Sequence, residues 1–129
     1  MNVKALLLVL MILGHLLADY PLQGWLAQAK NKTYWENAPK KNKHDYIPAL
    51  VCHSFMWGII TFIPILLTSF FTNVRYEWVT YLLLAVAILT HYFVDNAKAN
   101  EKVLNLWQDQ LIHLGQIICS WLIFIIICL

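Results

Sequence analysis

Long apolar blocks constrain this chain more than any other feature of its sequence. Four of them cover residues of about 3–19, 47–71, 78–95 and 109–129. As α-helices that rise about 1.5 Å per residue, such blocks can cross a hydrocarbon core about 30 Å thick, the first only just. Inside a bilayer a helix also satisfies its own backbone polar groups. The sequence therefore predicts an all-α polytopic membrane protein, a bundle of four transmembrane helices.

Composition supports a single membrane domain over residues 1–129. Of these residues 60% are hydrophobic and 12% are charged, whereas a soluble domain carries roughly a quarter charged residues. The formal net charge of +2 is too small to indicate a nucleic-acid partner. The first block would be a secretory signal peptide if a small-x-small cleavage motif followed it. No such motif follows, so we interpret the block as a membrane helix.

Two polar connections, residues 23–47 and 96–108, lie on one side of the predicted bundle. They hold most of the positive charge, namely Lys30, Lys32, Lys40, Lys41, Lys43, Lys98 and Lys102. The other side holds Lys4 and Arg75. Because cytoplasmic loops carry the excess of lysine and arginine, we expect the long connections in the cytoplasm and both termini outside. Aromatic residues in the first connection predict a short interfacial helix over about residues 22–30.

Each apolar block carries histidine or aspartate at the end nearest the long connections. Three His/Asp pairs are spaced four residues apart, which places both members on one helix face, and one histidine stands alone. The seven residues are His15, Asp19, His53, His91, Asp95, Asp109 and His113. Because successive helices alternate in direction, we expect all seven at one depth on the cytoplasmic side.

Ionisable side chains inside a membrane are costly and indicate function. Neutral imidazoles and carboxylates are the ligands of zinc, iron and manganese, and the helices of a bundle can direct them to one point. We predict that all seven residues bind a divalent metal ion, with zinc first and iron or manganese as alternatives. Seven residues exceed the needs of one tetrahedral ion. They fit two ions, or one ion with outer carboxylates that orient the imidazoles.

The same set suggests catalytic roles. Bound metal can activate water and clamp a phosphoryl group. We predict catalytic roles for Asp19, Asp95 and Asp109, one of which would act as general base where it does not bind metal. Lys98 follows Asp95 by three residues and would neutralise it or bind a phosphate. His44 lies among lysines of the first connection, and we exclude it as a solvated side chain.

Several segments resemble a known family when they are taken together. They are His15-Leu-Leu-Ala-Asp19-Tyr-Pro-Leu-Gln23, Thr90-His91-Tyr-Phe-Val-Asp95 and Asp109-Gln110-Leu-Ile-His113, with Trp25, His53 and Lys98. The chain resembles the domain-of-unknown-function family numbered 3307, small integral-membrane proteins of bacteria and their phages. The resemblance implies a bacterial inner-membrane protein with these polar positions, and it brings no reaction with it. A looser likeness links the His/Asp pairs to membrane-bound metal-dependent hydrolases.

We therefore expect a metal-dependent hydrolase whose substrate is a phosphorylated lipid, because the predicted site opens at headgroup depth beside lysines. A proton or metal-ion transporter or channel is the first alternative, and its complete pathway would need a homo-oligomer. A membrane interaction or effector protein is the second alternative, in which the seven residues form a structural hydrogen-bond network.

Overall fold

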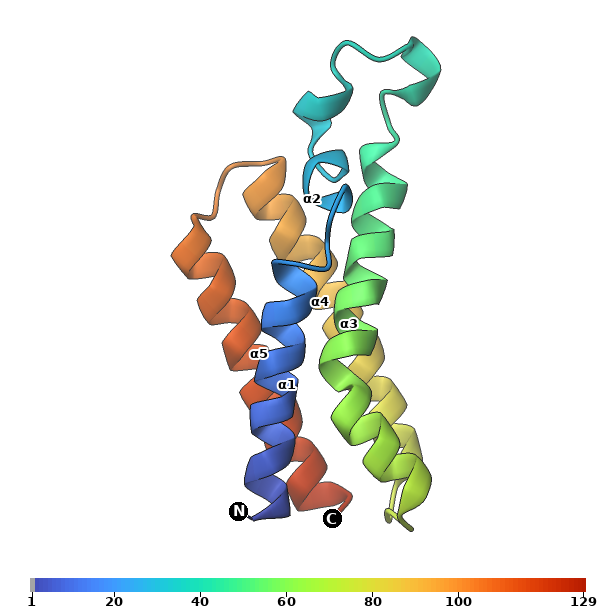
Figure 1. The fold of residues 1–129 in the computed structure, drawn as a ribbon, viewed down its shortest axis with the longest axis vertical. Helices are drawn as coiled ribbons and strands as arrows, with labels where there is room; N and C mark the ends of the chain where they lie inside the picture. The colour runs from blue at the N-terminus through green and yellow to red at the C-terminus, as the bar shows by residue number, and fades with distance from the viewer. Residues whose placement is uncertain (1) are drawn as a thin grey trace.

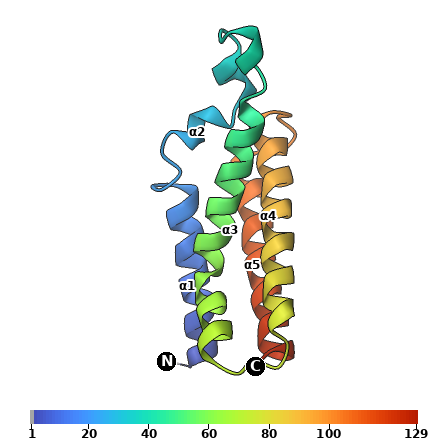
Figure 2. The same cartoon turned by 90° about the vertical axis from the view of Figure 1, so that its right-hand side faces the viewer.

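The computed structural model describes residues 2–129, without the side chain of Lys41, and contains four long helices. They are α1 (Val3–Asp19), α3 (Tyr46–Phe71), α4 (Glu77–Ala99) and α5 (Leu106–Ile127). Figures 1 and 2 show the four helices running up and down beside one another. The two termini lie at one end, and the two long connections lie at the other (Figure 1).

The first long connection carries short helical turns. The helix α2 covers Leu26–Ala29, and two 3₁₀ turns cover Lys32–Trp35 (η1) and Lys40–Asn42 (η2). Our expected helix over about residues 22–30 was therefore too long. The chain turns at Gly24, whose φ of 49° lies in the left-handed region, where a helix cannot begin.

Two helix boundaries differ from the apolar blocks. The helix α4 continues beyond Asp95 to Ala99, because alanine and lysine are strong helix formers even where the segment is polar. The helix α5 begins at Leu106, three residues before the predicted start. A capping box sets this start: Asn105 accepts from the Gln108 backbone N–H, and the Gln108 side chain accepts from the Asn105 backbone N–H.

The long helices contact one another in a ring, from α1 to α3, α4, α5 and back to α1. Their core contains large apolar side chains that are fully buried: Met11, Trp57, Phe62, Ile117 and Phe124. The outward faces are also apolar, with exposed side chains such as Phe70, Phe93, Leu111 and Ile126. An apolar outer surface of this extent needs lipid or protein to cover it.

Three of the helices, α3, α4 and α5, have the length and the apolar composition that crossing a membrane requires. The remaining long helix, α1, has 17 residues and is about 26 Å long at about 1.5 Å per residue. It is as apolar as its neighbours but shorter than the hydrocarbon core of a typical bilayer, about 30 Å.

A close approach between α1 and α3 is made at Gly14. A Cβ atom at this position would lie 2.7 Å from the carbonyl oxygen of Ile60 and 3.0 Å from Cα of Thr61. Both are backbone atoms, so one helix would have to move. A Cβ atom added at Gly115 on α5 would meet no other atom within 4 Å.

We expect Gly14→Ala to lower the stability of the bundle by about 1–3 kcal/mol, the usual cost of overpacking. Gly115→Ala should leave stability unchanged or raise it slightly, because alanine is the better helix former. Thermal unfolding of both variants in mild detergent measures the difference. Equal melting temperatures for the two variants would contradict the close contact.

Candidate metal centre

All seven predicted polar residues lie together in the buried interior of the bundle. α1 contributes His15 and Asp19, α3 contributes His53, α4 contributes His91 and Asp95, and α5 contributes Asp109 and His113. Six of them have no exposed surface, and Asp19 is 4% exposed. The seven residues share one level of the bundle, because each lies in the part of its helix nearest the long connections. Their place on the cytoplasmic side stays a prediction.

One group of ligand atoms gathers around Asp19 and Asp95. Asp19, His53, His91 and Asp95 each place one nitrogen or oxygen within 4.8 Å of the others. The Nε2 atom of His53 lies 3.4 Å from Asp19 Oδ1, 3.2 Å from Asp95 Oδ2 and 3.1 Å from His91 Nε2. Ligand atoms around a tetrahedral zinc ion stand roughly 3.3–3.5 Å apart, given metal–ligand distances of about 2.0–2.1 Å. These separations therefore suit a metal ion.

A second group uses Asp19, Asp109 and His113, again within 4.8 Å of one another. The Nε2 atom of His113 lies 3.3 Å from Asp109 Oδ1 and 3.7 Å from Asp95 Oδ1. Asp19 belongs to both groups. Because a carboxylate has two oxygens, Asp19 has the position expected of a residue that bridges two metal ions.

In all three carboxylates the Oδ2 atom is held by a hydrogen-bond donor. In each, Oδ2 accepts a hydrogen bond from a fixed donor: Gln110 at Asp19, Lys30 at Asp95, and both Lys98 and Gln110 at Asp109. Each Oδ1 lies near a histidine Nε2, and at Asp95 the Oδ2 atom does so as well, 3.2 Å from His53 Nε2. Outer donors that hold one oxygen and orient the other are typical of metal-binding carboxylates.

Several polar atoms of the cluster have no hydrogen-bond partner among residues 2–129. They include Asp95 Oδ1, Asp109 Oδ1 and His113 Nε2, all buried. Such atoms are costly in a dry interior. A cation close to them would satisfy two carboxylate oxygens and one imidazole nitrogen together, so the residues present fit a divalent metal ion.

His15 differs from the other three histidines. Its Nδ1 accepts a hydrogen bond from Trp57 Nε1 at 2.8 Å, which leaves the proton on Nε2 to be donated to Gln110 Oε1 at 3.1 Å. Both ring nitrogens are therefore engaged, and His15 belongs to neither metal-binding group. Through Gln110 it fixes the direction of the amide that holds Asp19 and Asp109.

Trp57 supports the cluster from the side of the apolar core. It is fully buried, and its indole ring stacks on the His91 imidazole with centroids 4.2 Å apart and planes 13° apart. With its hydrogen bond to His15, one side chain orients two histidines. In the sequence, the only sign of this role is that Trp57 follows His53 by four residues, which places both on the same helix face.

Two lysines balance the buried carboxylates. Lys98 donates to Asp109 at 2.5 Å and not to Asp95, the carboxylate that we expected it to neutralise. Its alternative role, binding a phosphate, stays a prediction. Asp95 is paired with Lys30, also at 2.5 Å, and Lys30 is 6% exposed. Sequence reasoning counted Lys30 among the topological lysines and missed this role. A lysine one residue after α2 can reach Asp95 only because the connection folds back over the bundle (Figure 2).

Gln110 also belongs to the cluster, although it follows Asp109 directly and therefore points in a different helical direction. The structure places its amide between His15, Asp19 and Asp109. Successive residues of a helix differ by about 100° in direction, which a long side chain at the edge of the buried face can span.

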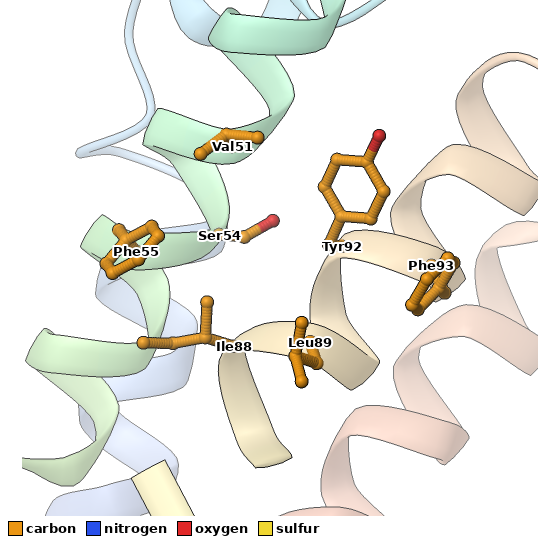
Figure 3. Close-up of a pocket in the computed structure, with 7 residues that line it drawn as sticks. All are labelled: Val51, Ser54, Phe55, Ile88, Leu89, Tyr92 and Phe93. Carbon is orange, nitrogen blue, oxygen red and sulfur yellow. The ribbon is translucent and has the colours of Figure 1, made fainter. Parts of the chain in front are cut away.

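An apolar groove of about 200 Å³ lies outside the cluster, between α3 and α4 (Figure 3). Ser54 and Tyr92, the sequence neighbours of His53 and His91, line it together with Phe55 and Leu89. The groove offers surface for a hydrocarbon chain. Its lining within the described chain contains no carboxylate, histidine or lysine, in contrast to the cluster.

The fold and the cluster define a bundle of apolar helices with a buried His/Asp centre at one end. A family model matches residues 7–128, and its family is described as a protein of unknown function, DUF3307. The chain belongs to this family, which confirms the resemblance seen in the sequence. No curated protein and no solved structure matches the chain.

Loss of the Lys30 ammonium would leave Asp95 charged and buried. We expect Lys30→Met to destabilise the bundle by about 3–5 kcal/mol, the usual cost of removing one partner of a buried ion pair. The double variant Lys30→Met/Asp95→Asn should recover most of the loss, because the uncompensated charge is removed. Lys43→Met, an exposed lysine of the same connection, is the control. Thermal unfolding in detergent gives the comparison, and a Lys30→Met protein as stable as the control would contradict the pairing.

Proposed function

We propose that the protein is a membrane-embedded metal-dependent hydrolase that acts on a phosphorylated lipid or a similar substrate. One observation carries the proposal: three carboxylates and three imidazoles from all four long helices gather in two buried groups of possible ligand atoms that share Asp19. A purely structural network would be expected to pair its polar atoms with one another. Here His113 Nε2 lies 3.3 Å from Asp109 Oδ1 and 3.7 Å from Asp95 Oδ1, yet it makes a hydrogen bond to neither.

The residues that would hold the metal are Asp19, His53, His91, Asp95, Asp109 and His113, with zinc as the first candidate and iron or manganese next. His15 acts through Gln110 in this proposal and orients carboxylates instead of binding the ion. A bound divalent ion supplies Lewis acidity and lowers the pKa of a coordinated water.

The chain's own residues would do the remaining chemistry. An aspartate oxygen left without a metal bond would take the proton of the attacking water. When the ion is held by Asp19, His53, His91 and Asp95, Asp109 Oδ1 would be that oxygen. Lys30 and Lys98 would face a phosphoryl group that approaches from the connection end, where their ammonium groups lie beside Asp95 and Asp109. Charge-assisted hydrogen bonds to phosphate are the strong ones.

The proposal includes four membrane crossings, with the long connections in the cytoplasm and the termini outside. Its support is the antiparallel arrangement, which gathers seven lysines at one end and leaves Lys4 and Arg75 at the other. The short helix α1 would cross with the help of local bilayer thinning. The cluster would then lie near headgroup depth in a bacterial inner membrane, within reach of a lipid phosphate.

A pathway for protons or metal ions, through one chain or a homo-oligomer, is the less well supported alternative. From the cluster to the end that carries the termini, the buried polar side chains of the described chain are those of Thr61, Ser69, Thr80 and Ser120. The rest of that interior is apolar, with Phe62, Ile65 and Phe124 fully buried. A relay would need titratable groups along the whole path, so the interior favours the hydrolase over a transporter or channel.

Metal content is the first test of the proposal. We expect the protein, purified in mild detergent after growth with zinc, iron and manganese, to carry one of these metals in stoichiometric amount. His91→Ala should lower the content at least tenfold, in the range seen when metal-site residues are removed. His44→Ala, an exposed histidine of the first connection, should retain it. Elemental analysis of the three proteins is the measurement.

Full metal content in His91→Ala would contradict the proposed site. Absence of metal from the wild-type protein would favour a proton relay or a structural network. In the alternative of a membrane interaction or effector protein, toxicity to a host cell should persist when the histidines are replaced by alanine.

Hydrolysis is the second test. We expect phosphate release from a short-chain phosphatidic acid to fall by about 10²–10⁴-fold in Asp109→Asn, the usual contribution of a general base. Asp45→Asn lies in the first connection, away from the cluster, and should keep the wild-type rate. A colorimetric phosphate assay on metal-loaded protein makes the comparison. Equal rates in the two variants would remove Asp109 from the reaction.

A further inference from the structure

A polar hollow of about 320 Å³ opens at the connection end of the bundle, where α2 meets the end of α4. Three lysines and two amides line it together with two alanines: Gln23, Lys30, Asn31, Lys98 and Lys102. Lys30 and Lys98 also donate to Asp95 and Asp109. The hollow and the His/Asp cluster therefore share Lys30 and Lys98.

The walls of the hollow are fixed by hydrogen bonds between the two connections. Asn100, which follows α4, accepts from the Lys32 backbone N–H at 2.8 Å and donates to the Lys30 carbonyl at 3.1 Å. The Asn31 side chain donates to the carbonyl of Ala27 at 2.9 Å. Lys30 and Lys98 consequently face each other across the hollow through contacts between segments about 70 residues apart in the chain.

The charge of the hollow is positive. No carboxylate of the described residues lines it, and the Glu101 side chain accepts from Asn96 at 2.6 Å, outside the lining. Two of the three ammonium groups are balanced by buried aspartates, so Lys102 supplies the surplus charge. Its ammonium donates to the Ala99 carbonyl at 2.5 Å and so offsets the negative end of α4, which would otherwise repel an anion.

The backbone at Lys102 is unusual. Its φ is 59°, the only positive value of a non-glycine residue in the described chain. Glycine or asparagine is the common choice for this conformation, since a bulkier residue loses roughly 1–2 kcal/mol there. A lysine at such a position gives up backbone stability while it places an ammonium group at the rim of the hollow.

Gln23 gives the hollow an acceptor. Its Nε2 donates to the Asp19 carbonyl, and its Oε1 is buried with no partner in residues 2–129. A phosphate that carries one proton would match both features, because its charged oxygens suit the lysines and its hydroxyl can donate to Gln23. Carboxylates and sulfates lack such a hydroxyl at neutral pH.

We propose that this hollow is a phosphate-binding site, with Lys102 as the residue whose charge attracts the anion. The phosphate group is either free phosphate or the headgroup of a lipid. The inference deepens the proposed function and rests on it for what happens after binding. Binding itself depends on the lysines and Gln23 and needs no metal.

The test is isothermal titration calorimetry of the full chain in mild detergent, before and after chelation of metal. The probes are inorganic phosphate and dihexanoyl phosphatidic acid, with zwitterionic dihexanoyl phosphatidylcholine as the negative control. We expect Lys102→Gln to weaken phosphate binding about tenfold or more, the effect of losing one hydrogen bond to a charged group. Lys102→Arg should bind nearly as the wild type does. Lys43→Gln, which loses the same charge elsewhere on the connection, should bind normally.

Thermal unfolding and metal content, measured on the same samples, show that each variant is folded and loaded. Tighter binding of phosphatidic acid than of phosphate assigns the site to a lipid, and equal binding assigns it to the free anion. The inference is overturned when Lys102→Gln and Lys43→Gln bind alike, or when neither probe binds the wild type. Phosphate binding that depends on Lys102, in a wild-type protein that takes up no metal during growth with zinc, iron and manganese, would refute the proposed hydrolase and leave this site standing. Stoichiometric metal in a wild-type protein that binds neither probe would refute the phosphate site alone.

Discussion

Burial of three carboxylates inside an apolar bundle is the constraint on which the rest of this structure depends. An isolated charge in such an interior costs several kcal/mol even after relaxation, and Asp19, Asp95 and Asp109 lie within one cluster. Each is tolerated because a donor holds its Oδ2: an amide of α5, a lysine beyond α2 or a lysine at the end of α4. The first connection must therefore fold back over the bundle to deliver Lys30. The path of the polar connection and the position of the buried centre are two consequences of one electrostatic requirement.

The antiparallel order of the helices turns a simple sequence pattern into a site. The His/Asp pairs of α1 and α4 lie near the ends of their helices. The histidine of α3 and the reversed pair of α5 lie near the starts of theirs. Because alternate helices run in opposite directions, all of these residues meet at one end of the bundle. Close packing then sets the distances. Gly14 lets the backbones of α1 and α3 approach, and Trp57 fills the space beneath the cluster while it holds His15 and His91. The apolar half of the bundle thus supports the polar half.

The sequence was sufficient for the helices and for the seven polar residues, because both follow from local patterns: apolar blocks and a spacing of four. It was insufficient for the contacts made by long side chains. Lys30 reaches Asp95 across 65 positions of the chain, and nothing in its neighbourhood separates it from Lys32 or Lys43. Gln110 joins the cluster although its helical direction differs from that of Asp109. The ends of α4 and α5 were misjudged for a related reason: polarity was taken as the end of a helix, whereas capping by Asn105 and the propensity of Ala97 and Lys98 decide it.

Charge balance bears on how many ions the centre can hold. With neutral histidines, three carboxylates and the two paired lysines leave one net negative charge. One divalent ion would turn this into one positive charge, which a singly charged phosphate would neutralise. Two divalent ions would leave three positive charges in a dry interior, which is unfavourable unless a lysine withdraws. The bridging place of Asp19 allows two positions, but the lysine pairing favours one ion at a time.

An arriving phosphate would also compete for Lys30 and Lys98 and free the Oδ2 atoms of Asp95 and Asp109. The anion and a second cation would then bind with mutual support, each offsetting the charge that the other brings.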